Sequence, residues 1–578
     1  MNKFWGDYRE NSMKKLICLL CVGAMVLTGC TTKNEPTDGG KTEQELATYT
    51  GKGSGYGGEL TVEVDMLGSE IKDIRVIDHK ESSPVFSRAL PVIKERILEA
   101  QSPIVDSVSA ATFSSYAVKA AVAEAAKQGG VDFGEITFTT KGEEKPAKEL
   151  EAVQTQLVIV GGGPAGLSAA ISAKEAGLEN VILIEKLDIL SGNGKFDMNF
   201  FDLINSEAQK KAGIEYTKEQ FIEDKKTSTD SPERIEAWAE GEYTLDAWLR
   251  GMGIELNQSN GGTNHMAEAD AYAGEHIQEG LEKRAKELNV DIRTGTKGND
   301  LIMENGECKG VMVTNNNNES YNILAAATII ATGGFCSNKE LVAEYAPGYE
   351  VLNTSNQLGT TGDFVKVFEK NGFAMENMDM VRVFPLIISV RRDLTGGADQ
   401  FILVNKEGNR FIAESAGGIK LGTTIQAQSD GAAYYITDQS GYDSFYRIRK
   451  HVNAGYYVTG QTMAEIAEQL GIDAEQLQAT FDSFNAAAAA GENDEFSGKP
   501  ENRPMDAQGP YYAVRVESAN HMTKGGVVAN EKAQVLYEDG SVVKGLYASG
   551  EVTWQSGGYS QSVSFGRVAG ENAAASLE

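Results

Sequence analysis

The chain has 578 residues, 41% of them hydrophobic, which is too long for one core and indicates roughly two to four domains. Its 83 acidic and 53 basic residues give a formal net charge of −30, which opposes binding to nucleic acid and to anionic lipid surfaces. Five cysteines in a chain of this length exclude a disulfide scaffold. Small molecules and redox proteins are therefore the expected partners.

The N-terminus is typical of a lipoprotein signal peptide. Met13-Lys14-Lys15 supplies a basic start, an apolar run follows, and Leu27-Thr28-Gly29-Cys30 resembles a lipoprotein signal box. The apolar run is well short of the roughly 20 residues that a membrane-spanning helix needs. Translation starts at either Met1 or Met13. We expect residues 1–29 to be removed and Cys30 to carry a lipid that anchors an extracytoplasmic protein to the cell membrane.

A small α+β domain is predicted after the signal peptide. Residues 30–46 are polar and predict a flexible tether, and residues 47–139 form the domain itself. Alternation of apolar and polar residues over Leu60–Val64 and again over Ile71–Ile77 predicts a hairpin, and a helix is expected over Ser114–Gln128. Residues 140–153 are charged, contain a proline and are typical of a linker.

One short motif in this domain carries chemistry. Asp106-Ser107-Val108-Ser109-Ala110-Ala111-Thr112 resembles the acceptor sequence for covalent FMN, Asp-x-x-Ser/Thr-Gly-Ala-Ser/Thr, with alanine at the usual glycine. The resemblance implies an FMN-binding domain in which FMN is joined to Thr112 by a phosphodiester and Asp106 and Ser109 belong to the site. It also implies a flavin transferase for maturation. A covalent cofactor suits a protein that works outside the cytoplasm.

A second motif predicts a dinucleotide site. The apolar strand Gln156–Val160 runs into the turn Gly161–Gly166, and a small-residue helix and the strand Asn180–Ile184 follow, ending at Glu185. This is the order that a Rossmann fingerprint requires: glycines admit the pyrophosphate to a helix N-terminus, and an acidic residue binds ribose hydroxyls. A similar glycine pattern at residues 53–58 precedes a strand instead of following one, and we interpret it as a loop.

Three further segments favour FAD over NAD. Ala331-Thr332-Gly333-Gly334-Phe335, Thr361-Gly362-Asp363 and a C-terminal stretch from Gly545 to Glu551 together resemble the flavoprotein subunits of the fumarate reductase and succinate dehydrogenase superfamily. The resemblance runs from Leu157 to the C-terminus and implies FAD. We expect the FAD to be non-covalent, because no histidine lies beside the fingerprint to form the covalent link seen in membrane-bound relatives. The cofactor contacts that it implies are Gly161, Gly163, Ala165, Gly166, Glu185, Gly192, Asn193, Gly194, Gly333, Gly334, Asp363, Glu551 and Gln561.

With the first domain in front, the architecture resembles the bacterial extracellular flavin reductases of the fumarate and urocanate reductase group. The resemblance implies an α/β and α+β multidomain fold: a Rossmann-like FAD-binding domain in two parts, residues 154–372 and 518–578, with an inserted α+β capping domain at 373–517. The sequence holds no second fingerprint for NAD(P)H. We therefore expect electrons to arrive through the FMN from a membrane electron-donor system, as part of anaerobic respiration.

The group's chemistry is hydride transfer from FAD to one carbon of an activated C=C bond and a proton to the other. Three departures bear on the substrate: Phe384 stands where fumarate reductases have a substrate-binding histidine, Gly418 where they have a proton-donating arginine, and the arginine that grips a carboxylate near Gly558 is missing. An uncompensated buried carboxylate costs about 3 to 5 kcal/mol. We therefore expect a larger and less anionic enoate or enone in place of fumarate.

Other polar residues become the candidates for catalysis. Tyr559-Ser560 resembles a Tyr-Ser pair of flavin ketosteroid dehydrogenases that holds a ketone oxygen, although Tyr559 could instead pack over the flavin edge. Arg382 and Arg391 are alternative acids or carboxylate holders, with a surface position as the competing interpretation for each, and the same holds for the neighbouring Arg392. His521 either lines the pocket or makes a supporting hydrogen bond. The remaining histidines lack metal-ligand spacing, so no metal site is expected.

Three functions stay open from the sequence. The first is an anchored extracellular reductase that uses an organic acceptor. The second is a flavin reductase or dehydrogenase of ketosteroid type, in which Tyr559 and Ser560 are central. The third is a non-enzymatic electron-transfer flavoprotein, which a large capping domain argues against because a carrier needs no substrate chamber.

Overall fold

The computed structural model describes residues 45–81, 83–194, 198–226, 230–259, 262–268, 271–388, 391–492, 496, 503–554 and 558–578. The expected signal peptide, Cys30 and nearly all of the expected tether lie outside these residues. Leu46–Glu578 form one compact unit. No helix among the described residues has the length and apolar character to cross a membrane.

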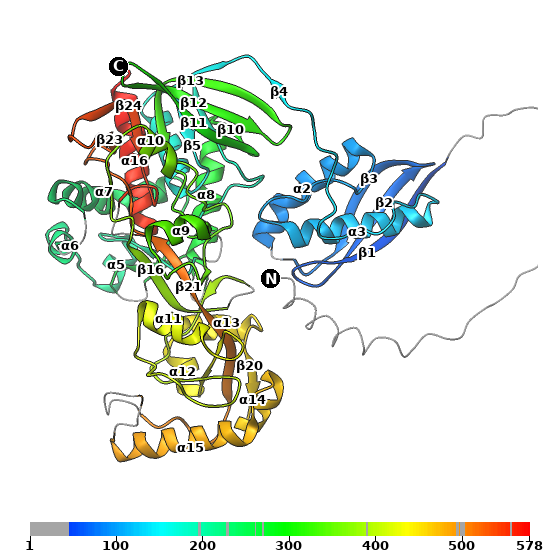
Figure 1. The fold of residues 1–578 in the computed structure, drawn as a ribbon, viewed down its shortest axis with the longest axis vertical. Helices are drawn as coiled ribbons and strands as arrows, with labels where there is room; N and C mark the ends of the chain where they lie inside the picture. Colours follow the sequence, from blue (N-terminus) through cyan, green and yellow to red (C-terminus); the bar gives the residue numbers. More distant parts are fainter. Residues whose placement is uncertain are drawn as a thin grey trace, which may run out of the picture. The chain divides into compact units, whose positions relative to one another are not determined.

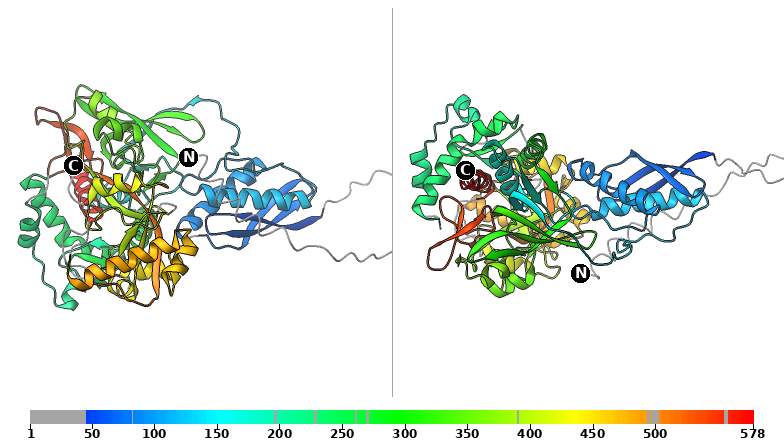
Figure 2. Two further views of the ribbon diagram at one scale, coloured as in Figure 1. Left: turned by 60° about the horizontal axis from the view of Figure 1, so that its bottom comes forward. Right: turned by 90° about the horizontal axis from the view of Figure 1, so that it is seen from above.

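The N-terminal domain is an antiparallel three-stranded sheet in the order β1-β2-β3, and two helices lie across one face of it (Figure 2). The predicted hairpin is β2 and β3, joined at Gly68, and the predicted helix is α3. The sequence patterns do not predict β1 or α2. The elements are β1 (Leu46–Ser54), β2 (Glu59–Leu67), β3 (Glu70–Asp78), α2 (Ser83–Ala100) and α3 (Thr112–Gln128).

Glycines let β1 approach α3 closely. A Cβ on Gly51 would lie 2.0 Å from the carbonyl oxygen of Ala121, and one on Gly53 would lie 2.0 Å from that of Ala117. Beyond them, the Gly55 amide donates to the Gly58 carbonyl at 2.7 Å and closes the turn into β2. The glycine pattern at residues 53–58 therefore serves strand-to-helix packing and a turn, in a domain whose core contains alternate residues of β2.

The FAD-binding fold is built on a nine-stranded sheet whose main path runs β10-β6-β5-β13-β12-β24-β23, with β11 beside β12 and β4 beside β13 (Figure 1). Strands β10, β6, β5 and β13 are parallel, as the predicted strand-turn-helix-strand order requires. The strands are β4 (Lys148–Glu149), β5 (Val153–Val160), β6 (Val181–Ile184), β10 (Asp291–Arg293), β11 (Thr296–Glu304), β12 (Glu307–Asn315), β13 (Glu319–Ile330), β23 (Gln534–Leu536) and β24 (Val542–Ala548).

Helices α4 (Pro164–Glu175) and α16 (Tyr559–Ala575) pack closely together beside this sheet. The approach depends on small residues: a Cβ on Gly566 would lie 2.4 Å from the Ala165 carbonyl oxygen, and one on Gly570 would lie 2.3 Å from that of Ala169. The C-terminal helix thereby brings its first turn next to the N-terminus of α4. The other elements outside the cap are β7 (Phe201–Asp202), α5 (Glu207–Ala212), α6 (Lys218–Lys225), α7 (Pro232–Gly251), β8 (Gln258–Ser259), β9 (Asn264–Met266), α8 (Ala273–Glu287), α9 (Lys339–Tyr345) and α10 (Val365–Lys370).

The capping region contains a mixed sheet in the order β17-β16-β21-β19-β18, with β14 and β20 also on β21. Helices α14 and α15 belong to this region. The elements are β14 (Asn353–Thr354), β16 (Val381–Ile388), β17 (Asp393–Leu394), β18 (Ile402–Val404), α11 (Gly418–Gln426), β19 (Ala433–Thr437), α12 (Gln439–Ser444), α13 (Tyr446–Asn453), β20 (Val458–Gly460), α14 (Met463–Leu470), α15 (Ala474–Ala490) and β21 (Tyr511–Thr523).

Continuous strands connect the cap to the FAD-binding fold. β21 crosses the expected boundary at 517 without a break and runs from the cap helices toward the main domain (Figure 1). On the other side, β15 (Met375–Glu376) pairs with β22 (Gly526–Val527), which places the first residues after 373 against the C-terminal part of the FAD-binding fold. His521 and Met522 of β21 line the cavity described next.

Candidate functional site

The glycine turn opens a helix N-terminus toward a cavity. Gly161 has φ +116°, and a Cβ there would lie 2.3 Å from the Ala331 carbonyl oxygen. A Cβ on Gly166 would lie 1.9 Å from the Gly161 carbonyl oxygen, so this glycine is needed for helix-to-strand packing. Helix α4 begins after Gly163 with no side-chain cap. Its first amides can therefore bind an anion such as a pyrophosphate.

Glu185 lies at the end of β6, as the fingerprint predicts. It is buried, and its two carboxylate oxygens accept from the amides of Gly162 and Leu187, each at 2.8 Å. Burial raises the pKa of the Glu185 carboxyl. The group lines the same cavity as the glycine turn and is placed to bind ribose hydroxyls.

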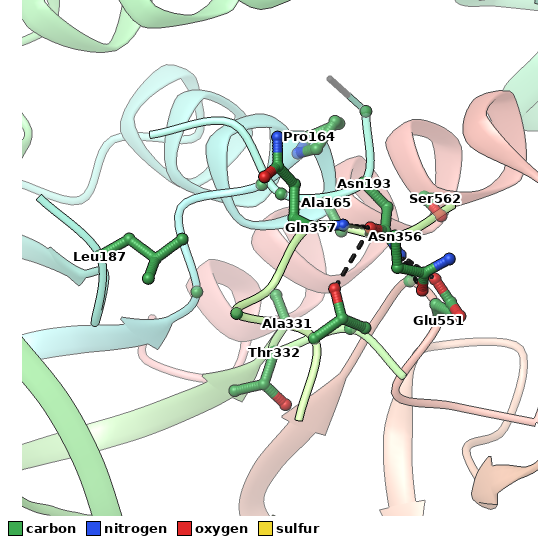
Figure 3. A pocket seen from close by; sticks show the side chains of 18 of the residues that line it. Pro164, Ala165, Leu187, Asn193, Ala331, Thr332, Asn356, Gln357, Glu551 and Ser562 are labelled. Atoms are coloured by element: carbon green, nitrogen blue, oxygen red, sulfur yellow. Dashed lines mark hydrogen bonds between the residues drawn. The ribbon is translucent and has the colours of Figure 1, made fainter. Parts of the chain in front are cut away.

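Asn193 links three separate segments around the cavity (Figure 3). Its Nδ2 donates to Asn356 at 2.7 Å and to Glu551 Oε2 at 2.9 Å, and its Oδ1 accepts from the Gln357 amide at 3.0 Å. Burial raises the pKa of the Glu551 carboxyl to about 7. Within the described part of the chain, the hydroxyl of Thr332 on the same wall is buried with no hydrogen-bond partner, which suits a cofactor with polar edges.

Asp363 is held by a cation beside Glu185. Lys186 Nζ lies 2.6 Å from Asp363 Oδ2, and the Thr361 hydroxyl donates to Oδ1 at 3.0 Å. Burial opposes ionisation of Asp363, but Lys186 lowers its pKa below the ordinary value. Asp363 and Lys186 both line the cavity, together with Glu185.

The cavity contacts most of the predicted cofactor residues of the FAD-binding fold. The open space of the cavity, including its mouth, is about 1470 Å³. Three predicted residues lie elsewhere: Gly166 packs against the Gly161 carbonyl, Gly334 packs against Thr523 and Glu551, and Gln561 donates to Asp230 at 3.0 Å. The predicted residues on the wall are Gly161, Gly163, Ala165, Glu185, Gly192, Asn193, Gly194, Gly333, Asp363 and Glu551.

Tyr559 lines the cavity from the first turn of α16. Its hydroxyl donates to the Gly194 carbonyl at 3.3 Å, its ring packs edge-on against Phe201, and burial raises its pKa. Ser560 is buried and interacts with Glu242, and Ser562 lines the cavity instead. Residues i and i+3 share a helix face whereas i and i+1 do not, so Tyr559 and Ser560 are not presented as a pair.

His521 lies on the cavity wall from β21. Its Nδ1 lies 2.8 Å from the Ser355 hydroxyl, and the Phe384 ring packs against it with centroids 5.7 Å apart. Both sequence interpretations of His521 therefore apply, since it lines the pocket and makes a polar contact. Phe384 offers no donor for a carboxylate.

The three candidate arginines have different environments. Arg382 and Arg392 line the cavity, whereas Arg391 lies with its guanidinium 3.9 Å from the ring centroid of Tyr456 and 5.0 Å from that of Tyr56 in the N-terminal domain. Arg392 has φ +54°, a left-handed conformation that turns it away from the side taken by Arg391. Nothing local to the sequence indicates this backbone reversal, so the sequence does not distinguish Arg391 from Arg392.

A buried polar network beside the cavity was not expected from the sequence. Asp393 lines the cavity and its Oδ2 lies 2.9 Å from the Tyr272 hydroxyl and 3.0 Å from His451 Nε2. The other ring nitrogen of His451 contacts Thr395, whose hydroxyl meets that of Tyr457. These residues are far apart in the sequence, so spacing alone could not find the network.

The residues of the FMN-acceptor motif form the loop before α3. Thr112 is exposed and begins the helix, and its N-cap Ala111 makes no side-chain cap. Ala110, where the acceptor pattern has glycine, has φ +69°. Lys119 is fully buried below the loop and donates to the Val105 carbonyl at 2.9 Å. The arrangement presents a hydroxyl at an uncapped helix N-terminus, which suits a phosphodiester. Across the described ranges, no group of three acidic, histidine or cysteine side chains could hold a metal.

Comparison with known proteins supports both cofactor sites. Residues 156–566 match the FAD binding domain family and residues 55–127 match the FMN-binding domain family. The chain is 32% identical to the urocanate reductase of Eggerthella lenta over 96% of each chain, and 32% identical to a fumarate reductase (cytochrome) of Shewanella frigidimarina over 72% of this chain and 76% of the relative. The structure of the open conformation of a flavocytochrome c3 fumarate reductase superposes with a TM-score of 0.66 at 31% identity, over 73% of this chain and 78% of the other.

Proposed function

This chain belongs to the fumarate and urocanate reductase family of flavoproteins, and we propose that it reduces the activated C=C bond of an enoate or enone that is bulkier and less anionic than fumarate. One observation carries the proposal. The cavity that contains the glycine turn and Glu185 is also lined by Leu394 and Arg392 of the cap and by Tyr559, so cofactor and acceptor would share one chamber.

Bound FAD would supply the hydride in this chamber. The chain's own residues would hold the acceptor and stabilise negative charge on its activating oxygen. Tyr559 suits this role because its pKa is raised by burial, which keeps the phenol protonated at neutral pH. Its present bond to the Gly194 carbonyl is long at 3.3 Å, so an acceptor oxygen can replace that partner.

The cavity wall disfavours a dicarboxylate. Phe384 packs its aromatic ring against His521, which lines the cavity, and offers no donor for a carboxylate. Gly418 is exposed and is not among the residues that line the cavity. Arg382 and Arg392 remain on the wall and could pair with one carboxylate. The buried carboxyl of Asp393 on the same wall opposes a second anionic group.

The rest of the proposal concerns electron supply. FMN bound covalently at Thr112 would receive electrons from a membrane donor system after maturation by a flavin transferase. A lipid on Cys30 would hold the protein at the outer face of the membrane, where a covalent cofactor cannot be lost. The exposed Thr112 hydroxyl at the start of α3 supports the attachment, and the signal-box sequence supports the anchor.

Anaerobic oxidation of the dithionite-reduced protein by a panel of acceptors tests the proposed chemistry. We expect flavin reoxidation by bulky monocarboxylate enoates or by cyclic enones and only slow reoxidation by fumarate. Rapid turnover with fumarate would contradict the proposed substrate class.

A ketosteroid-type reductase is the second candidate, because Tyr559 lies in the cavity where it could hold a ketone oxygen. A steroid enone in the acceptor panel separates the two candidates. A non-enzymatic carrier is disfavoured by the cap residues that line the cavity.

A further inference from the structure

The FMN-acceptor motif is bound directly by the loop that follows Glu185. Asp188 is 8% exposed, and its Oδ2 accepts from the Ser109 amide at 2.7 Å and from the Ser109 hydroxyl at 2.8 Å. In return, the Asp188 amide donates to the same hydroxyl at 2.7 Å. A residue of the FAD-binding fold and a residue of the motif are thus joined by three hydrogen bonds.

The other carboxylate oxygen of Asp188 is also occupied. Arg96 Nη2 donates to Oδ1 at 2.6 Å and Asn316 Nδ2 donates to it at 2.6 Å. The guanidinium of Arg96 additionally donates to the carbonyls of Asp106 and Ser107, at 3.3 and 3.2 Å. Arg96 therefore holds the motif backbone and Asp188 together, and bonds between ionised partners are the stronger kind.

Apolar packing extends this contact. Ile189 is 4% exposed and belongs to the same apolar cluster as Val105, Val108 and Ala111 around the motif. The buried carboxylate and the neighbouring isoleucine together form a two-residue plug, Asp188-Ile189, inserted against the N-terminal domain. Such a combination of apolar contact and satisfied charge is typical of a specific interface.

The plug lies between the two cofactor sites. Glu185, Lys186 and Leu187 line the FAD cavity immediately before it, while Thr112 lies three residues beyond Ser109 in the motif. We propose that Asp188 is a docking residue that holds the FMN-bearing loop in the arrangement from which electrons pass to FAD. In that transfer, reduced FMN is oxidised by two electrons and FAD is reduced by two, with two protons released and two taken up. The proposal rests on the proposed function for the presence of FMN at Thr112.

The docking itself is tested on flavin-free protein by hydrogen exchange. Asp188→Ala removes the acceptor of the Ser109 amide, so we expect that amide to exchange about tenfold faster or more. Asp291→Ala is the matched control, since Asp291 is also an aspartate of the FAD-binding fold paired with an arginine, Arg293, at 2.7 Å. Unchanged exchange at Ser109 in Asp188→Ala would overturn the docking role.

Electron transfer is tested on the fully flavinylated protein without any acceptor. After flash photoreduction, we expect electron redistribution from FMN to FAD to be about tenfold slower or more in Asp188→Ala, with FAD and FMN content unchanged. Faster Ser109 exchange with an unchanged transfer rate would also overturn the proposal. Asp188→Asn keeps the shape of the side chain and one oxygen that can accept both hydrogen bonds from Ser109. It should slow electron transfer less than Asp188→Ala does, and it replaces the alanine variant in both experiments if that variant folds poorly. If no acceptor of the panel reoxidises the flavin, the proposed substrate class is refuted, but amide exchange at Ser109 and the FMN-to-FAD transfer rate are still measurable. Mass spectrometry shows whether FMN is absent from Thr112.

Discussion

The Glu551 carboxylate accepts a hydrogen bond from Asn193 at 2.9 Å in a partly buried position between the FAD-binding fold and the cap strand β21. Its other oxygen accepts from the Thr523 amide at 3.0 Å. These neutral donors do not offset the loss of water, so burial raises the pKa of Glu551 to about 7. The carboxyl is therefore a pH-dependent element of the FAD site.

Stability of the flavin-free protein should depend on this group. The pKa of Glu551 is about 7 in the folded protein and 4.5 in the unfolded chain, so the folded state is favoured by protonation of this carboxyl. The contribution of Glu551 to the free energy of unfolding is therefore fully present below pH 4.5 and is lost as pH rises through 7. We expect Glu551→Gln to raise the free energy of unfolding relative to wild type by about 3 kcal/mol more at pH 8 than at pH 4.5. Thermal unfolding across this pH range measures the difference. Exposed Glu538→Gln is the control, and an equal shift for both variants would contradict the prediction.

The backbone at Ala110 predicts a stabilising substitution. At φ +69° an alanine is strained and a glycine is not, so Ala110→Gly should stabilise the N-terminal domain by about 1 kcal/mol. Hydrogen exchange of α3 in the full chain reports this change. Ala111→Gly is the matched control: Ala111 has φ −130° and is buried, so glycine there relieves no strain and loses a contact. Slower exchange in Ala111→Gly than in Ala110→Gly would contradict the argument.

The part of the site that the sequence predicts best depends on local spacing. Gly161, Gly166 and Glu185 lie within one strand-turn-helix-strand unit, so their order in the chain fixes their places around the α4 N-terminus. The same holds for the hairpin of β2 and β3, whose alternating residues are buried on one face.

The substrate side could not be predicted in this way, because its residues depend on helix phase, backbone reversal and long-range packing. Ser560 faces Glu242 because one step along a helix changes the face, and Arg392 replaces Arg391 at the cavity because of its left-handed φ. Asp393 meets Tyr272 and His451 only once the cap is folded onto the FAD-binding fold.

Covalent FMN at Thr112 is the third prediction. After co-expression with a flavin transferase, the tryptic peptide containing Thr112 should gain the mass of FMN less water, and Thr112→Ala should abolish the gain. Thr137→Ala, in the exposed segment after α3, is the control and should keep the modification. An unmodified wild-type peptide under these conditions would refute the assignment.

FAD should be bound without a covalent link, because its predicted contacts are backbone amides, Glu185 and amide side chains such as Asn193. Acid precipitation should therefore release FAD into the supernatant and leave FMN in the pellet, as measured by chromatography of the two fractions. Retention of both flavins by the precipitated protein would show that the assignment of the two linkages is wrong.

The last prediction concerns Tyr559. If its phenol stabilises the developing enolate, Tyr559→Phe should lower turnover with the true acceptor by about a hundredfold to a thousandfold while leaving both flavins bound. The ring contact with Phe201 should persist, since only the hydroxyl is removed. Tyr537→Phe is the matched control, because the Tyr537 hydroxyl donates to the Gly306 carbonyl at the surface, away from the cavity. Reoxidation of the dithionite-reduced flavin by the acceptor measures turnover for each variant, and a Tyr559→Phe enzyme as fast as wild type would remove Tyr559 from the chemistry.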